Sequence, residues 1–197
     1  IIMRIGIDID GVLTDVERWQ LDYGSKFFYE KYNKNIVNHK GYEMTDIFDV
    51  SPSLDDEVWK KYLLTYAREE KPRKFADEII NKLKQEGNEI YIITARCLTD
   101  RNDELGVQMK EIIINWLKQN NINYDKIIFS PEDKVDICLE KNINLMIEDK
   151  VDNITKISKH IPVICFHANY NEICSGENII RCYSWYDIYR NIKNMCE

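Results

Sequence analysis

The sequence has none of the features expected of a membrane protein or of a nucleic-acid-binding protein. Its apolar runs fall far short of the roughly 18–20 residues that a membrane span needs. Its 27 basic and 34 acidic residues give a net charge of −7, and no long run of Lys and Arg is present. Such a chain repels a phosphate backbone. We therefore expect neither a membrane nor a nucleic-acid polymer as a partner.

The sequence also lacks the spacings of common metal and disulfide motifs. The closest two of its six cysteines, Cys174 and Cys182, are eight residues apart (182 − 174), so neither a CxxC pair nor a zinc-finger spacing occurs. Its three histidines form no HExxH pair. The opening residues, IIMRIGIDID, are typical of a strand rather than of a signal peptide. These features predict a cytoplasmic protein with reduced thiols.

The composition and the order of local patterns indicate a globular α/β protein. Of the 197 residues, 44% are hydrophobic and 31% are charged, which excludes global disorder and suits one domain with an insertion. After Pro72, helical patterns alternate with continuous apolar strands, which predicts a parallel sheet covered on both faces, a three-layer Rossmann-like fold. The predicted strands are 4–9, 89–94, 126–130, 144–148 and 162–166.

A helical segment interrupts this alternation directly after the first strand. Its apolar residues recur at helical spacing: Val16, Trp19, Tyr23 and Phe27. A second helix is predicted after Ser51-Pro52, where serine suits the cap and proline the first turn, and residues 33–51 are predicted to be mainly loop. We therefore predict an α/β core of residues 1–13 and 73–197, and a small helical cap of residues 14–72.

Polar residues stand at the carboxyl ends of the predicted strands, where open parallel sheets bind ligands. They are Asp8 and Asp10 after the first strand, Thr94 after the second, Lys134 after the third, and Glu148 with Asp149 after the fourth. On a regular strand, Asp8 and Asp10 would face the same way. Bringing these carboxylates together with Glu148 and Asp149 concentrates negative charge, which a divalent cation offsets. Hard oxygen ligands with room for water suit Mg²⁺.

A metal ion, a lysine and a hydroxyl beside carboxylates form a site for a phosphoryl group. The cations neutralise phosphate oxygens and so allow an anionic carboxylate to approach phosphorus. The carboxylate then acts as the nucleophile and forms an aspartyl-phosphate. The residues thus predict Mg²⁺-dependent chemistry on a small phosphorylated metabolite.

Four segments, in order along the chain, resemble the motifs of the haloacid dehalogenase (HAD) superfamily of phosphotransferases. DIDGVLTD at 8–15 is similar to the first motif, DxDGxxxD, and Thr94, Lys134 and Glu148-Asp149 resemble the second, third and fourth. The resemblance spans positions 8 to 149 and implies a HAD-like fold. An aspartate in both positions of the first motif resembles the phosphatase pattern, since the dehalogenase branch lacks the second.

The resemblance implies a catalytic role for each motif residue. Asp8 attacks phosphorus and becomes phosphorylated. Asp10 protonates the leaving oxygen and then activates the water that hydrolyses the intermediate. Thr94 and Lys134 hold the phosphoryl oxygens.

The resemblance also implies the metal ligands. Mg²⁺ is bound by the Asp8 carboxylate, the Asp10 main-chain carbonyl and Asp149. Glu148 is expected beside the metal, either directly or through water, and Asp152 is a candidate supporting residue further from it.

A narrower resemblance is to the 5′-nucleotidase group that contains the 5′(3′)-deoxyribonucleotidases and bacterial members. It rests on DGVLTD, IITAR and IEDKVDNI, and on a cap inserted after the first strand. It implies that the substrate is a nucleoside monophosphate. In the vertebrate deoxyribonucleotidases an aromatic residue directly after the first motif stacks on the base, and here that place is Val16. Their fourth motif is Asp-Asp, whereas here it is Glu148-Asp149.

Residues that bind the rest of the substrate are expected among aromatic and basic side chains. Trp19 is a candidate for stacking on a base; the alternative is that Trp19, Tyr23 and Phe27 form the core of the cap. Arg96 and Arg101 are candidates for binding phosphate or substrate, with a solvated charge as the alternative for Arg101.

Other functions remain open at this stage. One alternative is a HAD phosphatase for a sugar phosphate or another small phosphorylated metabolite. Another is a binding or regulatory protein on the same fold, although a site without activity has no need of so costly a charge cluster. A response-regulator receiver fits poorly because it has no such insertion after its first strand. The oligomeric state, a homo-oligomer included, is also left open.

Overall fold

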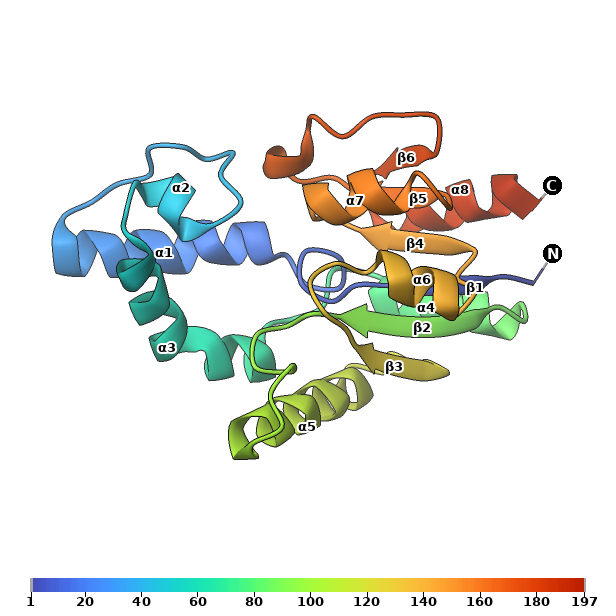
Figure 1. Cartoon of the computed structure of the whole chain (residues 1–197), viewed down its shortest axis with the longest axis horizontal. Coiled ribbons are helices and arrows are strands. Elements are labelled where there is room, and N and C mark those ends of the chain that lie inside the picture. Colours follow the sequence, from blue (N-terminus) through green and yellow to red (C-terminus); the bar gives the residue numbers. More distant parts are fainter. Residues whose placement is uncertain (1, 197) are drawn as a thin grey trace.

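The computed structural model describes residues 2–196, which contain a six-stranded parallel sheet (Figure 1). The strands are β1 (Arg4–Ile7), β2 (Glu89–Thr94), β3 (Lys126–Phe129), β4 (Leu145–Glu148), β5 (Val163–Phe166) and β6 (Ile179–Cys182). The order β3-β2-β1-β4-β5-β6 places the first strand in the centre, beside the fourth. This order confirms the predicted Rossmann-like fold.

Helices cover both faces of the sheet. The first face packs against α4 (Ala76–Gln85), α5 (Glu104–Gln119) and α8 (Trp185–Cys196), and the second against α6 (Val135–Glu140) and α7 (Val151–Ile157). Successive strand residues join opposite faces: Ile92 belongs to the first hydrophobic cluster, and Tyr91 and Ile93 belong to the second. Burial on both faces is the reason why these strands are almost continuously apolar.

Three further helices form a layer beyond the carboxyl ends of the strands, on the left of Figure 1. They are α1 (Val16–Tyr32), α2 (Met44–Phe48) and α3 (Pro52–Glu69). Asp15 caps α1 by accepting a hydrogen bond from the Arg18 amide at 3.0 Å. The three helices bury a hydrophobic cluster of their own, whose fully buried members all lie between Val16 and Tyr66. This separate core supports our proposal that residues 14–72 form a cap.

Arg73 holds together the two chain segments that connect the cap to the core. Its guanidinium donates to the carbonyl oxygens of Gly11 at 3.1 Å and Thr14 at 3.2 Å, and it pairs with Asp15 at 3.3 Å. The same guanidinium lies 4.2 Å from the centre of the Phe166 ring on β5. The segment that leaves β1 and the segment that returns to α4 are thereby fixed to each other and to the sheet.

The structure differs from the predicted elements in three places. β1 ends at Ile7 rather than at residue 9, α2 lies inside the predicted loop 33–51, and β6 is an additional strand. α2 has only five residues, and β6 is an edge strand of four residues of which three are half-buried. Elements this short and this exposed do not develop the periodicity that identifies longer ones.

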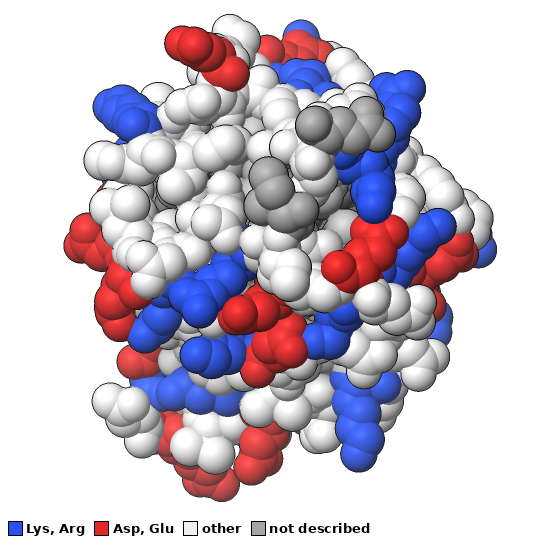
Figure 2. Space-filling view, turned by 90° about the vertical axis from the view of Figure 1, so that its right-hand side faces the viewer, with Lys and Arg blue, Asp and Glu red and all other residues white. Residues whose placement is uncertain are grey.

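The face opposite the cap carries basic and acidic side chains interspersed, and neither sign gathers into one large patch in that view (Figure 2). Such a mixed surface creates no strong field of one sign. Within the described part of the chain, no helix combines the length and the apolar character that a membrane crossing requires.

Candidate active site

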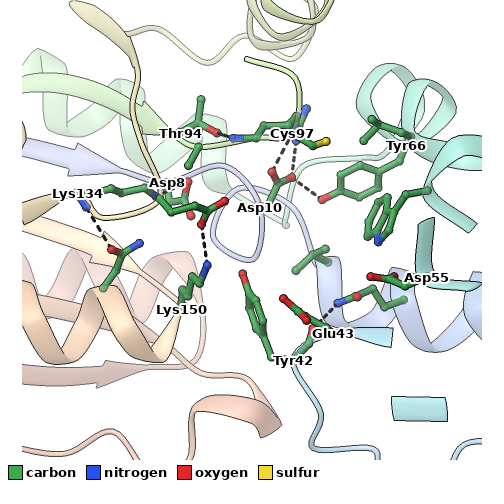
Figure 3. Close-up of a pocket in the computed structure, with 18 of the residues that line it drawn as sticks. Asp8, Asp10, Tyr42, Glu43, Asp55, Tyr66, Thr94, Cys97, Lys134 and Lys150 are labelled. Atoms are coloured by element: carbon green, nitrogen blue, oxygen red, sulfur yellow. Dashed lines mark hydrogen bonds and ion pairs between the residues drawn. The ribbon is translucent and has the colours of Figure 1, made fainter. Parts of the chain in front are cut away.

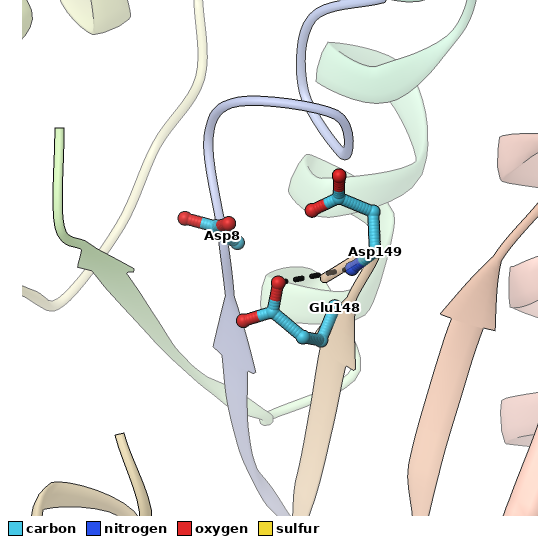
Figure 4. Close-up of side chains that lie close together, drawn as sticks. All are labelled: Asp8, Glu148 and Asp149. Atoms are coloured by element: carbon cyan, nitrogen blue, oxygen red, sulfur yellow. Dashed lines mark hydrogen bonds between the residues drawn. The ribbon is translucent and has the colours of Figure 1, made fainter. Parts of the chain in front are cut away.

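The candidate active site lies where the carboxyl ends of β1 and β4 meet. From this central pair, β2 and β3 extend to one side and β5 and β6 to the other, so the chain connections diverge and leave a crevice. The segment after β1 carries Asp8 and Asp10, and β4 ends at Glu148 with Asp149 directly after it. Residues from opposite halves of the chain therefore meet at one edge of the sheet (Figures 3 and 4).

The segment after β1 turns at Gly11 and passes very close to Asp149. Gly11 has a φ of +88°, and a Cβ added there would lie 2.0 Å from the Asp149 Oδ2. Only glycine satisfies both the backbone conformation and the close approach. The Asp8 amide donates to the carbonyl of Ile147 at 3.2 Å, which continues the pairing of the two strands up to the first motif residue.

Lys134 is a buried cation that bridges two carboxylates. It is 2% exposed, and its Nζ lies 2.9 Å from Asp8 Oδ1 and 2.9 Å from Glu148 Oε2. Burial opposes the charge, but the two neighbouring carboxylates outweigh burial and raise the pKa of Lys134 above its usual value. Lys134 therefore remains charged and can bind an anion at the cavity floor.

Asp8, Glu148 and Asp149 form a compact acidic cluster, shown in Figure 4. One carboxylate oxygen from each lies within 4.8 Å of the others, and all three residues are buried. Burial raises the pKa of Asp8 to about 8, although Lys134 opposes the shift. Burial likewise raises the pKa of Asp149, and the charges of Glu148 and Asp8 add to that shift. Without a bound cation, Asp8 and Asp149 therefore tend to keep their protons, because full ionisation would place more negative charge there than the neighbours neutralise.

The charge balance of the site fits a bound divalent cation. With Asp10 included, four carboxyl groups face two buried cations, Lys134 and Arg96, so ionisation of all four would leave an excess of two negative charges. A doubly charged ion offsets that excess, and carboxylate oxygens are suitable ligands for Mg²⁺. The acidic cluster therefore has both the charge and the donor atoms of a metal site.

Backbone and side-chain donors hold the acidic cluster in place. Glu148 Oε1 accepts hydrogen bonds from the amides of the two residues that follow it, at 3.0 and 3.1 Å. The Tyr170 hydroxyl donates to Asp149 Oδ2, and the Asn171 side chain donates to the Asp149 carbonyl at 2.9 Å. Tyr170 and Asn171 lie in a short 3₁₀ turn after β5, which has no signature in the sequence.

Asp152 does not occupy the supporting position expected of it. Its side chain is 75% exposed and pairs with Lys156 at 3.4 Å. The following residue, Asn153, is buried; it donates to Glu148 Oε2 at 3.4 Å and accepts from the Lys134 amide at 3.3 Å. A shift of one position along α7 changes which side chain faces the cluster, and sequence spacing alone does not resolve that shift.

The Asp10 carboxylate has partners that differ from those of Asp8. Arg96 donates from Nε to Asp10 Oδ2 at 3.0 Å and from Nη2 to Oδ1 at 2.5 Å, and the Tyr66 hydroxyl donates to Oδ1 at 2.7 Å. Burial alone would raise the pKa of Asp10, but the charge of Arg96 and the hydrogen bonds from Arg96 and Tyr66 together outweigh burial and lower it. The expectation that the Asp8 and Asp10 side chains face the same way holds for a regular strand. β1 ends at Ile7, so both residues lie beyond the strand.

Thr94 lies at the end of β2 and is fully buried. Its Oγ1 accepts a hydrogen bond from the Arg96 amide at 3.2 Å, which leaves its own hydrogen available to an anion. Thr94 lines the same cavity as Asp8 and Lys134. The structure therefore brings together the side chains that the sequence placed at the ends of separate strands.

The two arginines that follow β2 differ in their surroundings. Arg96 is 5% exposed and lines the cavity, and its Nη1 is buried without a hydrogen-bond partner among the described residues. Arg101 is exposed and pairs with Asp103 at 2.9 Å through its Nε. Arg96 thus has a donor to offer a ligand, whereas Arg101 matches the alternative of a solvated charge.

The cap and the core together line a cavity of about 410 Å³, within the range of small-molecule sites. The core contributes Asp8, Asp10, Thr94, Arg96 and Lys134, among others. The cap contributes Val16, Gln20, Tyr42, Glu43, Asp55, Asp56, Trp59, Leu63 and Tyr66 (Figure 3).

Trp19 is not part of this cavity wall, contrary to its candidate role in stacking on substrate. It is 4% exposed, and its ring packs within the cap at 4.9 Å from the ring centre of Tyr23 and 4.8 Å from that of Trp59. Tyr23 and Phe27 are also absent from the cavity lining. The alternative, an aromatic cap core, describes Trp19 and Phe27, whereas Tyr23 is exposed and packs on Trp19 at the edge of that core. The aromatic face that reaches the cavity from α3 is Trp59.

The site combines an aspartate pair after β1 with a lysine before α6 and an acidic pair at the end of β4. This combination defines a hydrolase of the HAD superfamily. Solved structures of proteins from this superfamily have a similar fold. A haloacid dehalogenase-like protein of Agrobacterium tumefaciens aligns over 100% of both chains with a TM-score of 0.69 at 15% identity. A HAD-superfamily hydrolase of Ehrlichia chaffeensis aligns over 100% of both chains with a TM-score of 0.54 at 14% identity.

Within this superfamily the chain belongs to the family described as 5′ nucleotidase, deoxy (pyrimidine), cytosolic type C protein, which it matches over residues 2–195. It is 29% identical to a nucleotidase of Clostridium acetobutylicum over 197 residues, 99% of this chain and 96% of that protein. The family makes the protein a hydrolase of the phosphatase and nucleotidase type, and implies a phosphorylated small molecule as its substrate.

Proposed function

We propose that the protein is a Mg²⁺-dependent phosphomonoesterase that acts through an aspartyl-phosphate on Asp8. The contact between Asp8 and Lys134, 2.9 Å long and buried beneath a cavity, carries the proposal. A carboxylate next to a permanent cation can approach an anionic phosphoryl group, since the cation offsets the repulsion. The neighbouring carboxylates of Glu148 and Asp149 provide donors for a metal ion.

The side chains around the cavity hold the phosphoryl group in this proposal. The Thr94 hydroxyl and the Lys134 ammonium bind its oxygens, because both groups are buried at the cavity and have donor hydrogens. Mg²⁺ would be held by the carboxylates of Asp8 and Asp149 and by the main-chain carbonyl of Asp10. When bound, it supplies positive charge to the phosphoryl oxygens.

Asp8 and Asp10 divide the chemistry between them. The lowered pKa of Asp10 keeps it ionised in the free protein, so Asp10 takes a proton from solvent before this step. A bond then forms between Asp8 Oδ and phosphorus while the bond from phosphorus to the leaving oxygen breaks, and Asp10 passes its proton to that oxygen. Asp10 then takes a proton from the water that attacks the phosphorylated Asp8, and inorganic phosphate leaves. The separate partners of the two carboxylates support this division of roles.

We assign a nucleoside monophosphate, of the deoxyribonucleotide type, as the substrate. The family description names deoxy pyrimidine 5′-nucleotidases. The cap offers the rings of Trp59 and Tyr42 at the cavity, and a flat aromatic ring is a suitable surface for a base. Trp59 replaces Trp19 as our candidate for the stacking residue.

A phosphatase for sugar phosphates is the second candidate, because the cap wall is also acidic. Glu43 and Asp55 both line the cavity, and Asp55 Oδ1 is buried with no hydrogen-bond partner among residues 2–196. Carboxylates accept hydrogen bonds from sugar hydroxyls as well as from the amino groups of bases. The wall therefore favours a leaving group rich in hydrogen-bond donors and leaves both substrate classes open.

The cysteines support a reducing location. The structure describes five of them as free thiols, and four of these are buried: Cys138, Cys165, Cys174 and Cys182. Such thiols suit the cytoplasm, which we retain as a prediction.

Steady-state kinetics on a panel of phosphomonoesters test the proposal. The panel contains deoxyribonucleoside and ribonucleoside 5′- and 3′-monophosphates and sugar phosphates, each measured with Mg²⁺ and with EDTA. A kcat/KM for a nucleotide at least about tenfold above that for any sugar phosphate supports a nucleotidase. The reverse order selects the second candidate. Hydrolysis of no member of the panel would refute a phosphomonoesterase and favour a binding protein.

A further inference from the structure

Tyr66 connects the cap to Asp10, the residue that transfers protons in the proposed reaction. Its hydroxyl donates to Asp10 Oδ1 at 2.7 Å and lies 2.7 Å from Thr14 Oγ1. An ionised carboxylate can only accept, so the single phenolic hydrogen goes to Asp10. The Tyr66 oxygen is then free to accept from Thr14. A directed chain of hydrogen bonds runs from Thr14 through Tyr66 to Asp10.

The Tyr66 ring is fixed by its surroundings, so that its hydroxyl has one position. The residue is 3% exposed, and its ring centre lies 4.9 Å from that of Trp19 and 5.9 Å from that of Trp59. The Arg96 guanidinium lies 5.3 Å from the ring centre. The cap core therefore determines where the donor points, and that donor reaches across to a residue of the α/β core.

Tyr66 and Arg96 have different effects on Asp10. Arg96 reaches both carboxylate oxygens in a fork, which fixes the plane of the carboxylate. It belongs to the core, as Asp10 does, so its contact is independent of the cap. Among residues 2–196, Tyr66 is the only cap residue whose side chain donates a hydrogen bond to Asp10, and it selects Oδ1. The cap therefore influences the orientation of Asp10 through a single hydroxyl.

We propose that Tyr66 is a positioning residue that orients Asp10 for proton transfer to the leaving oxygen, so that the general acid is complete only with the cap in place. The proposal rests on the proposed phosphomonoesterase function. Asp10, ionised in the free protein, first takes a proton from solvent. During transfer, the bond from Asp8 to phosphorus forms, the bond to the leaving oxygen breaks, and that proton passes from Asp10 to the leaving oxygen. Tyr66 does not touch the reacting atoms in this step.

The leaving group provides a test that separates positioning from a general structural role. An alkoxide leaves with difficulty unless it is protonated, whereas p-nitrophenolate leaves readily without a proton. Correct orientation of Asp10 therefore matters for a nucleotide or a sugar phosphate and matters little for p-nitrophenyl phosphate. A damaged fold or a weakened phosphate site would slow both substrates by the same factor.

Tyr66→Phe is the main variant, because it keeps the buried ring and removes only the hydroxyl. Thr14→Val, which is close in shape, removes the hydroxyl that donates to Tyr66. Tyr62→Phe is the matched control: it lies four residues earlier on α3, and its ring packs 5.2 Å from that of Tyr23 inside the cap, away from Asp10. Thermal unfolding of each variant shows whether the fold is retained.

For each variant, kcat/KM is measured with p-nitrophenyl phosphate and with the alkyl phosphomonoester that the wild type hydrolyses best. For Tyr66→Phe we expect a loss of about tenfold with the alkyl ester and less than about twofold with the aryl ester. Thr14→Val should show the same selectivity with a smaller loss, and Tyr62→Phe should change neither value.

Equal losses with both substrates, or no loss with either, would overturn the role of Tyr66 while leaving the phosphomonoesterase function intact. If Tyr66→Phe proves unfolded, the selectivity of Thr14→Val decides in the same way. A wild-type protein that hydrolyses neither ester would instead overturn the proposed function, and the role of Tyr66 with it.

Discussion

The two ends of the cavity are built in different ways. At the core end, Lys134 and Glu148 are almost or fully buried, and each is held by several named partners. At the cap end, Asp55 is half-buried, and one of its oxygens has no partner among the described residues. The core end rests on the two central strands of the sheet, whereas the cap end rests on helices with a small core of their own.

This contrast matches a division of roles, in which the core end acts on phosphorus and the cap end selects the leaving group. Groups that act on phosphorus must keep one geometry, and strands buried on both faces supply that rigidity. Groups that contact the leaving group need only present suitable donors and acceptors. A cap with an independent core can change those groups without disturbing the sheet. Apart from Tyr66, which contacts Asp10, we therefore expect substitutions at the core end to affect turnover and those at the cap end to affect substrate preference and stability.

The largest expected effect is that of Asp8→Asn. The amide cannot attack phosphorus, so kcat should fall by about 10⁴-fold or more. The fold should survive, because the substitution removes one charge from a crowded acidic cluster and Lys134 keeps its contact with Glu148 at 2.9 Å. Steady-state kinetics together with thermal unfolding check both statements.

Asp22→Asn is the control for this substitution, because Asp22 is exposed on α1 and pairs with Arg18 on the same helix. It should leave kcat unchanged. Wild-type turnover by a folded Asp8→Asn protein would contradict the aspartyl-phosphate mechanism. It would also show that the core end of the cavity is not where the chemistry occurs.

The next effect concerns the metal. Mg²⁺ should raise the Tm of the wild type, because an ion that binds only the folded state stabilises it and here also offsets the repulsion among Asp8, Glu148 and Asp149. Asp149→Asn removes one proposed ligand, so the Mg²⁺ concentration for half-maximal activity should rise more than about tenfold, and the gain in Tm should shrink. Thermal scans and activity titrations over Mg²⁺ concentration measure the two effects.

Asp152→Asn is the matched control for the metal test, because its side chain is 75% exposed and lies three residues further along the chain. It should keep the wild-type response to Mg²⁺ in both measurements. A Tm that is insensitive to Mg²⁺ in the wild type would count against a metal site at the acidic cluster, whatever the activity.

The core end was largely predictable from the sequence. Asp8 and Thr94 stand at the ends of apolar strands, and Lys134 lies in the short segment between β3 and α6. Apolar strands of this kind define their own ends well. Parallel strands bring their carboxyl ends to one edge, so residues far apart in sequence could be placed together before the structure was known. Glu148 and Asp149 follow the same rule.

The cap end was much less predictable, for a physical reason. Tyr66, Trp59 and Trp19 all occur within helical apolar patterns, and a pattern shows that a side chain faces a core without showing which one reaches a cavity. Trp19 was chosen as the stacking residue and lies in the cap core, whereas Trp59 lines the cavity. Tyr170 was missed because its contact with Asp149 depends on a tertiary turn.

The smallest expected effect is that of Asp55→Asn at the cap end. Burial, with Glu43 and Asp56 next, raises the pKa of Asp55 to about 6 from 3.8. The folded state thus binds the proton more tightly than the unfolded state, so ionisation lowers stability as pH rises from about 4 to about 6. Asp55→Asn removes this cost. The variant should unfold a few degrees above the wild type at pH 7.5, and the difference should vanish near pH 4.

The KM of Asp55→Asn should rise with no change in kcat if Asp55 accepts hydrogen bonds from the leaving group equally in the ground and transition states. Thermal unfolding at four pH values and steady-state kinetics measure these effects, with the exposed Asp136→Asn as a control that should show neither. A difference in Tm that is the same at every pH would mean that ionisation of Asp55 does not lower stability at the cap end of the cavity. The charge of Asp55 would then not distinguish the cap end from the core end.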